Sequence, residues 1–288
     1  MLLTIAFTLL AVYLLLNLAL AWISLHPVRT PIFISAAAFG VPQEEVEFTN
    51  PDKLKLRGWW LDNPSTRTVI VFAHGYVMSR AELAPIAAHL YKLGCSCLLF
   101  EFRASGRSEG RKSGLGWLER SDVRSAVDFA RSRAPGAKIV LLGSSMGASA
   151  CAFALGENPL LADALVLDSA YSKLSRAIPG WWRFVGGQAL AWFLWPVTPV
   201  AAPMAGFNPY KVDVARSLSK LGGKPVLMLH GDADDMALPS EALRNRQACG
   251  AEIVWLPGCG HSEGRWVHPK LYLDALEDFL KRNGLLGE

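Results

Sequence analysis

Residues 141–150 read LLGSSMGASA, an apolar pair followed by a turn in which glycines flank two serines. Within this stretch, residues 143–147 (GSSMG) match the pattern Gly-x-Ser-x-Gly. In that pattern a sharp turn between a strand and a helix exposes the central serine, here Ser145, and glycines relieve the crowding around it. An ordinary tight turn capped by a serine has a similar sequence. The flanking segments must therefore distinguish the two interpretations.

The flanking sequence supplies the context that the pattern requires. Residues 138–145 (KIVLLGSS) predict a buried strand, and residues 146–155 (MGASACAFAL) are rich in helix-forming residues. Ser145 falls at their junction, and the N–H groups that follow it would lie at a helix N-terminus, where negative charge is stabilised. We therefore predict that the hydroxyl of Ser145 is exposed above a sheet, beside a position suited to an anion.

Apolar runs alternate with helix-like patterns along the rest of the chain. The runs TVIVFAH, CSCLLFEF, KIVLLGSS, ALVLDSA, KPVLMLHG and EIVWLPGC lack period-two alternation, which is typical of strands covered on both faces. Between them, apolar residues recur at helical spacing, as in residues 123–130 and 273–280. This alternation predicts an α/β fold with a mostly parallel central sheet and helices on both faces. Residues 44–62 predict a strand pair joined by a turn at Asn50-Pro51-Asp52.

The N-terminus carries an excess of apolar residues. Residues 2–25 contain no charge, and as a helix they would reach about 36 Å, enough to cross a hydrocarbon core of about 30 Å. Ala19-Leu20-Ala21 resembles a signal-peptidase site, but no Lys or Arg precedes the apolar stretch, which favours an uncleaved anchor. We predict a single-pass membrane anchor over residues 1–26, a linker over 27–43 and a globular domain over 44–288.

One segment interrupts the alternation of strands and helices. Residues 172–211 are predicted to form a small apolar cap over the strand ends. The stretch 178–207 has one charged residue, too many glycines and prolines for a second membrane span, and four tryptophans, Trp181, Trp182, Trp192 and Trp195. Apolar richness marks ligand pockets and cores alike, so the cap is expected either to line a pocket over Ser145 or to pack as core.

Two further residues complete an arrangement for nucleophilic catalysis. A serine hydroxyl needs a base to accept its proton and a carboxylate to orient that base. Asp234 follows one predicted strand, and His261 follows the next, so the chain order is Ser, Asp, His. Each residue alone reads as an ordinary loop residue. Three of them in order at predicted strand ends favour one shared site.

From about residue 46 to the C-terminus, the chain resembles the α/β-hydrolase superfamily, especially its membrane-anchored, small-cap serine hydrolases and the serine aminopeptidase-like group. The matching stretches are FAHGYVMSR, FEFRASGRSEG, GSSMGA, MLHGDADDMALP and GCGHS. The resemblance implies an α/β-hydrolase fold in which Ser145 is the nucleophile and His261 the general base. It also implies an oxyanion hole formed by the backbone N–H groups of Tyr76 and Met146.

The same resemblance leaves the position of the acid open between three aspartates. Counted forward from His230, the acid is Asp234, which we prefer. Counted back from Pro239, it is Asp235, and some members of the superfamily carry the acid one strand earlier, which here is Asp168.

These residues predict a membrane-tethered serine hydrolase that cleaves carboxylic esters or thioesters of apolar acyl groups. The cap would hold the acyl chain, with Trp192 and Trp195 setting its preferred length. A peptidase or amidase of the serine aminopeptidase type is the alternative, although residues 172–208 contain no Asp or Glu to bind a free amine. A non-catalytic scaffold is a third possibility, but such proteins commonly lose the serine or histidine.

Composition argues against several other classes of protein. The net charge of +4 is spread without a basic block, so no nucleic-acid partner is predicted. The five cysteines fit neither an even disulfide framework nor paired C-x-x-C zinc ligands, and we expect all five to be buried free thiols. No metal and no cofactor are predicted. The expected partners are a small-molecule or lipid-like acyl substrate and the lipid around the anchor.

Overall fold

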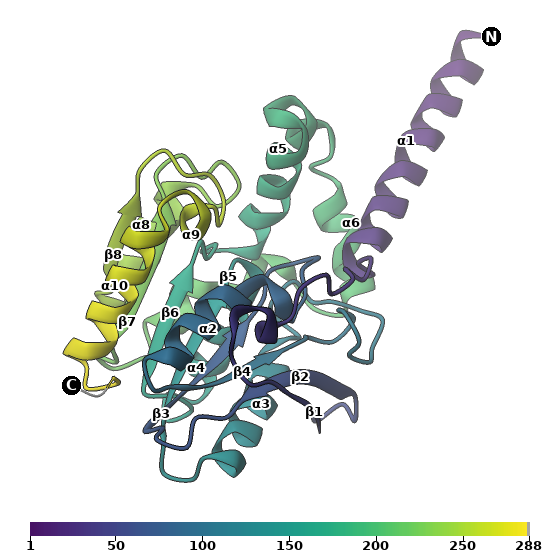
Figure 1. The fold of residues 1–288 in the computed structure, drawn as a ribbon. Coiled ribbons are helices and arrows are strands. Elements are labelled where there is room, and N and C mark those ends of the chain that lie inside the picture. Colours follow the sequence, from purple (N-terminus) through teal and green to yellow (C-terminus); the bar gives the residue numbers. More distant parts are fainter. Residues whose placement is uncertain (287–288) are drawn as a thin grey trace.

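The structure, a computed structural model, describes residues 1–286 and contains one eight-stranded sheet. The strand order is β1-β2-β4-β3-β5-β6-β7-β8, and helices cover both faces (Figure 1). The strands are β1 (Glu44–Thr49), β2 (Lys55–Leu61), β3 (Thr68–Ala73), β4 (Ser96–Phe100), β5 (Lys138–Ser144), β6 (Ala164–Asp168), β7 (Val226–Gly231) and β8 (Glu252–Leu256). Strands β3 to β8 pair in parallel, whereas β2 is antiparallel to β1 and β4. The predicted α/β fold with a mostly parallel sheet is confirmed.

Most of the helices connect successive strands. The α-helices are α1 (Leu2–Leu25), α2 (Ala84–Lys92), α3 (Arg120–Arg133), α4 (Met146–Glu157), α5 (Leu174–Phe193), α6 (Val197–Ala205), α7 (Val214–Leu218), α8 (Pro239–Cys249), α9 (Gly264–Val267) and α10 (Pro269–Arg282). Short 3-10 helices are η1 (Ala36–Phe39), η2 (Arg80–Leu83) and η3 (Pro209–Lys211). The predicted helical spacing is confirmed in α3, where Val123, Ala126, Val127 and Ala130 are all buried.

The central strands bury side chains on both faces, so their sequences show no polar alternation. Along β3, Val69 and Val71 pack in one hydrophobic cluster, and Ile70 and Phe72 pack in a second cluster on the other face. A sheet covered on both faces has no solvent side to favour polar residues. The predicted antiparallel pair is also present, because β1 and β2 pair on either side of the turn at residues 50–52.

The turn between β5 and α4 depends on two glycines that lie close to other backbone atoms. Strand β5 ends at Ser144, helix α4 begins at Met146, and Ser145 between them has a φ of 51° and a ψ of −113°. A Cβ atom on Gly147 would lie 2.1 Å from the carbonyl oxygen of Ala73, at the end of β3. A Cβ atom on Gly143 would lie 2.4 Å from a backbone nitrogen of α4. Glycine therefore permits the close approach of α4 to the sheet at this corner.

The predicted cap consists mainly of α5 and α6, which rise from the strand ends on one side of the domain (Figure 1). Helix α5 is interrupted where Gly186 and Gly187 leave the helical region, with φ values of −151° and 78°. The chain then folds back toward α6. This break explains why an apolar segment of this length does not form one straight helix.

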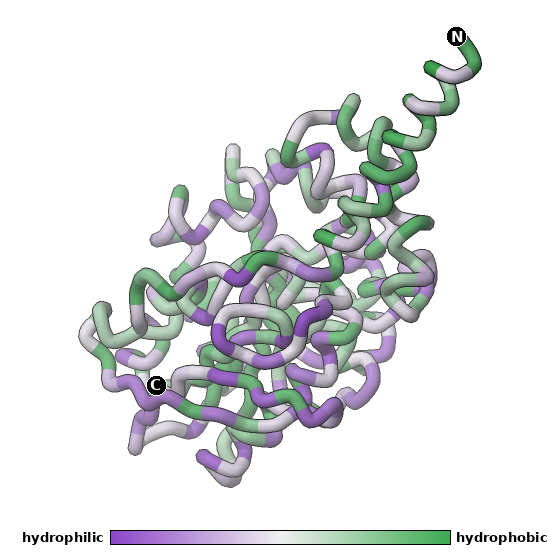
Figure 2. The backbone as a smooth tube through the Cα atoms, turned by 90° about the vertical axis from the view of Figure 1, so that its right-hand side faces the viewer, coloured by the Kyte–Doolittle hydropathy of each residue, from purple (hydrophilic) through white to green (hydrophobic). Residues whose placement is uncertain are grey.

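Helix α1 extends away from the domain and is apolar along its length (Figures 1 and 2). It is long and apolar enough to cross a membrane. Its C-terminal half packs on α6, where Asn17, Ala21 and Leu25 are buried. Most of its other side chains are exposed, which would be unfavourable for leucine-rich surface in water.

The segment predicted as a linker, residues 27–43, is held against the domain. The guanidinium of Arg29 donates to the carbonyl oxygens of Ser108 (2.5 Å) and Gly110 (2.7 Å). Ala36 in η1 is fully buried. The prolines and small residues of this segment predict only an irregular connection. They do not predict that it binds the domain, because the carbonyl groups that accept from Arg29 lie far away in the sequence.

One cysteine departs from the prediction. Four of the five free thiols are buried, but Cys249 is only half-buried. It is the last residue of α8, next to the exposed Gly250. A side chain at a helix end near the surface has fewer neighbours to cover it than a side chain in the middle of the helix.

We expect Gly147→Ala to destabilise the protein by about 3 kcal/mol or more, because the new methyl group overlaps the backbone of β3. Gly136→Ala is the matched control, since Gly136 has a φ of +82° and nothing within 4 Å of the added Cβ. Gly136→Ala should destabilise the protein by only about 1–2 kcal/mol, because the single penalty is that of placing alanine in a left-handed backbone conformation. Thermal unfolding of both full-length variants, followed by circular dichroism, measures the difference. Equal midpoints would contradict the close-approach argument.

Candidate active site

Three side chains meet at the carboxyl ends of the parallel strands. Ser145 follows β5, Asp234 follows β7 and His261 follows β8. The hydroxyl of Ser145 lies 2.7 Å from Nε2 of His261, and Nδ1 of His261 lies 2.8 Å from Oδ2 of Asp234. Because a carboxylate can only accept, Nδ1 carries the proton and Nε2 is free to accept the serine proton. The structure thus brings together the three residues that the sequence predicts.

The loop after β7 fixes the orientation of Asp234. Its Oδ1 accepts hydrogen bonds from the N–H groups of Met236 (2.9 Å) and Ala237 (2.8 Å), which leaves Oδ2 directed at His261. The neighbouring His230 donates from Nε2 to the carbonyl of Ala237 (2.7 Å). Burial lowers the pKa of His230, so this ring is neutral at pH 7 and does not compete as a cation for the carboxylate.

The two alternative aspartates lie elsewhere. Asp235 is exposed, and its backbone carbonyl accepts a hydrogen bond from Arg183. Asp168 is buried beneath the turn, where Oδ2 accepts from Arg265 (2.8 Å) and from the hydroxyl of Tyr272 (3.1 Å). Of the three candidates, Asp234 is the one hydrogen-bonded to His261.

The loop after β3 presents one of the two predicted oxyanion donors. Nδ1 of His74 donates to the carbonyl oxygen of Gly75 (2.7 Å), and Nε2 accepts from the N–H of Phe102 (3.1 Å). The N–H of Tyr76 belongs to the same planar peptide as that carbonyl, so it points the opposite way. His74 therefore orients this donor from a buried, neutral ring, since burial lowers its pKa.

Both predicted donors are available to a ligand. The N–H of Met146 is the first of helix α4, and within residues 1–286 neither it nor the N–H of Tyr76 has an intramolecular acceptor. The N–H of Gly75, by contrast, already donates to Glu82 (2.6 Å). Free N–H groups at a helix N-terminus stabilise negative charge.

A buried ionic network that the sequence analysis missed lies beneath the serine turn. Arg265 contacts Glu82 (2.6 Å) and Asp168 (2.8 Å), and the hydroxyl of Ser144 donates to Glu82 (2.9 Å). Burial alone would raise the pKa of Glu82, but Arg265 and the N–H of Gly75 outweigh it and lower that pKa, so Glu82 is a carboxylate at neutral pH. Glu82 thereby connects the serine turn to the loop after β3. No pattern in the sequence pairs η2 with the residues just after His261.

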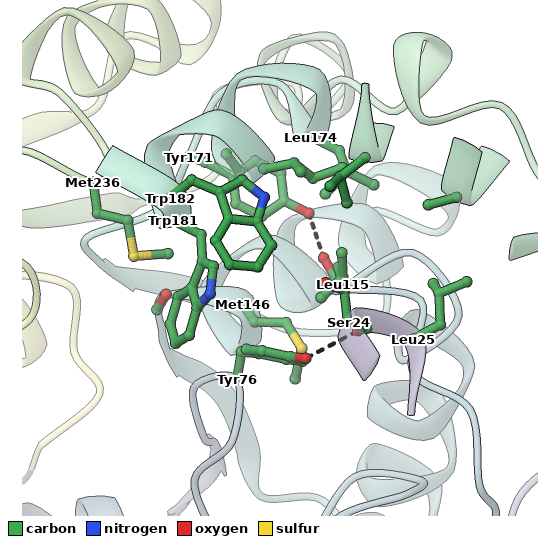
Figure 3. Close-up of a pocket in the computed structure, with 15 residues that line it drawn as sticks. Ser24, Leu25, Tyr76, Leu115, Met146, Tyr171, Leu174, Trp181, Trp182 and Met236 are labelled. Atoms are coloured by element: carbon green, nitrogen blue, oxygen red, sulfur yellow. Dashed lines mark hydrogen bonds between the residues drawn. The ribbon is translucent and has the colours of Figure 1, made fainter. Parts of the chain in front are cut away.

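An apolar pocket of about 60 Å³ adjoins Ser145 (Figure 3). Ile178, Trp181 and Trp182 of α5 line it together with Val197 of α6. The cap therefore both lines a pocket and contributes core packing, which the sequence analysis treated as alternatives.

The expectation that Trp192 and Trp195 line this pocket is wrong. Their side chains are 70% and 63% exposed, and they are absent from the pocket wall. Because the chain reverses at Gly186 and Gly187, the tryptophans before the break reach the pocket and the later pair lies outside it. Ser24 and Leu25 at the end of α1 also line the pocket (Figure 3). The sequence did not predict this contribution from the N-terminal helix.

In the described part of the chain, no group of three or more His, Cys, Asp or Glu side chains is arranged to hold a metal ion.

Comparison with known proteins assigns the chain to a family. The model of a family described as serine aminopeptidase, S33, matches residues 64–213. A relative from Mycobacterium tuberculosis is 28% identical over 250 residues, covering 85% of this chain and 81% of its own length. A protein named YfhR from Salmonella typhi is 27% identical over 264 residues, covering 83% and 81%. Both relatives are described as uncharacterised.

The structure is also similar to that of an esterase, Pf2001 from Pyrococcus furiosus. The TM-score is 0.75 at 25% identity, with 90% of this chain and 98% of the esterase covered. The fold predicted from the sequence is thus that of known α/β hydrolases. Since the family match extends over more than half of its length, this chain belongs to the serine aminopeptidase S33 family of α/β hydrolases.

Proposed function

We propose that this protein is a membrane-anchored serine hydrolase that cleaves carboxylic esters or thioesters of apolar acyl groups. The observation that carries the proposal is the 2.7 Å contact between the Ser145 hydroxyl and Nε2 of His261, with Asp234 2.8 Å behind the ring. This is the geometry that a general base needs in order to activate a serine.

The reaction follows from the positions of the groups. Nε2 of His261 accepts the proton of Ser145 as its oxygen attacks the acyl carbonyl, and Asp234 stabilises the imidazolium that forms. The N–H groups of Tyr76 and Met146 bind the resulting oxyanion. His261 then gives the proton to the departing alcohol or thiol, which leaves an acyl-enzyme. Water, activated by the same histidine, releases the carboxylic acid and restores the serine.

The pocket supports an apolar acyl group over a peptide. Its lining contains no Asp, Glu, Lys or Arg among the described residues, so a substrate amine would find no counter-charge there. The family description favours a peptidase, and the fold neighbour Pf2001 is called an esterase. The chemistry of the pocket wall favours the ester.

Ser145→Ala should abolish labelling by a fluorophosphonate, because the reagent reacts with the activated hydroxyl. Ser144→Ala is the matched control from the neighbouring position and should still be labelled, since its hydroxyl donates to Glu82 and not to His261. Gel fluorescence of the full-length proteins measures the label. Loss of labelling in Ser144→Ala with retention in Ser145→Ala would refute the assignment.

Asp234→Asn should lower kcat by roughly 10³- to 10⁴-fold, because an amide no longer holds the imidazole in the required tautomer or stabilises its charge. Asp235→Asn removes the same charge one residue away and should change kcat less than twofold. Turnover of a p-nitrophenyl ester measures both. A larger loss in Asp235→Asn would move the acid to that position.

For soluble p-nitrophenyl esters, kcat/KM should rise about fourfold per added methylene until the pocket is filled, since each buried methylene contributes about 0.8 kcal/mol. Trp181→Ala enlarges the pocket and should move the optimum to longer chains. Trp192→Ala removes the same side chain outside the pocket and should leave the optimum in place. A profile from acetate to octanoate that is flat, or that shifts equally in both variants, would count against the acyl pocket.

A further inference from the structure

We infer that the tip of the cap, residues 185–195, is inserted in the same bilayer as α1, so that the acyl pocket receives its substrate from lipid. The inference rests on the proposed anchoring of α1 in a membrane. It adds a second membrane-embedded element and identifies the substrate as an ester whose acyl chain resides in a bilayer.

Helix α1 is held firmly to the domain at its C-terminal end. The hydroxyl of Tyr76 donates to the carbonyl of Ser24 (2.9 Å), and the N–H of Ser113 donates to the carbonyl of Leu25 (2.8 Å). Arg29 holds the chain that follows through the loop carbonyls described above. These contacts satisfy carbonyl groups of the last helical turn and fix the direction in which α1 leaves the domain.

The cap tip contacts α1 well before the end of the helix. The hydroxyl of Tyr13 donates to the carbonyl of Phe193 (2.6 Å), and the two rings lie 4.9 Å apart. Trp22 is exposed, and exposed tryptophan in a membrane helix is typical of the membrane–water interface. Tyr13 lies nine residues before Trp22 in α1, which places it about 13 Å farther from the domain along the helix axis. A membrane that begins near Trp22 therefore surrounds Phe193 as well.

The surface of the cap tip suits this position. Val185, Trp192, Phe193 and Trp195 are all exposed, and no charged residue occurs between Arg183 and Lys211. The apolar parts of the cap and of α1 gather at one end of the molecule (Figure 2). Large apolar side chains grouped beside a membrane helix have a lower free energy in lipid than in water.

The backbone contact has the chemistry that lipid demands. A helix end leaves carbonyl groups without intrahelical partners, and no water is present in hydrocarbon to satisfy them. The Tyr13 hydroxyl satisfies the carbonyl of Phe193 at the end of α5. Asn17 is fully buried in the protein, where its amide nitrogen donates to the carbonyl of Tyr13 (2.9 Å) and its Oδ1 has no partner among the described residues.

Both α1 and the cap line the pocket. Ser24 and Leu25 of α1, Trp181 of α5 and Ala201 of α6 line it together with the nucleophile Ser145. The part of α1 that lines the pocket begins two residues after Trp22, so the pocket wall adjoins the proposed membrane surface. In the proposal, the substrate enters the pocket from this side.

Site-directed spin labelling of the full-length protein in phosphatidylcholine vesicles tests the insertion. Cys249, the one cysteine that is not buried, is replaced by alanine, and single cysteines are placed at Trp192, Leu10 and Leu160. Leu10 reports the proposed span, and Leu160 is an exposed apolar residue between α4 and β6. The Trp192 label should match Leu10 in high oxygen accessibility and low nickel-chelate accessibility. A Trp192 label that matches Leu160 while Leu10 stays in lipid would overturn the insertion, whereas water access at Leu10 would overturn the anchor on which it depends.

Substrate delivery is tested with a charged cap tip. Trp192→Glu should lower hydrolysis of a long-chain ester embedded in vesicles at least tenfold and leave hydrolysis of a soluble short-chain ester unchanged. Leu160→Glu, a charge added at an exposed apolar residue outside the cap, should change neither rate. Equal vesicle rates in the two variants would overturn delivery from lipid. A wild-type protein without esterase activity would refute the proposed function, while the spin labels still report the position of the cap tip.

Discussion

The left-handed backbone at Ser145 is the constraint on which the rest of the site depends. A non-glycine residue at a φ of 51° is strained by about 1–3 kcal/mol, and it persists because the packing around it leaves no alternative. Gly147 lets α4 contact the backbone of β3, and Glu82 holds Ser144 from below. The turn directs the serine hydroxyl to His261 and leaves the N–H of the next residue free at a helix N-terminus. One local conformation therefore positions both the proposed nucleophile and one of the two proposed oxyanion donors.

The network under this turn links elements that are distant in the sequence. Glu82 accepts hydrogen bonds from the loop after β3, from the serine turn and from Arg265, which follows the loop that carries His261. Breaking one partner of a buried ion pair leaves an uncompensated charge and is strongly destabilising. The network therefore makes the relative positions of the three loops depend on one another.

The N-terminal helix and the cap act as parts of one structure around the pocket. Ser24 and Leu25 line the pocket together with residues of the cap. Tyr76, whose N–H is a proposed oxyanion donor, uses its hydroxyl to bind α1. A helix that served only as a tether would not need these contacts. Helix α1 thus takes part in shaping the space next to Ser145, and removing it would open the pocket.

The sequence by itself determined the sheet, the serine turn and the order Ser145, Asp234, His261, because periodicity, glycine spacing and loop position after a strand are local properties of the chain. Three matters were decided only by the tertiary structure. Which aspartate faces His261 depends on the turn made by Met236 and Ala237, and distances across a loop are not encoded in residue type. The partners of Arg265 come from other loops. Whether a tryptophan lines the pocket or the surface depends on the direction of the chain after the break in α5, because apolar composition is the same for lipid, core and ligand.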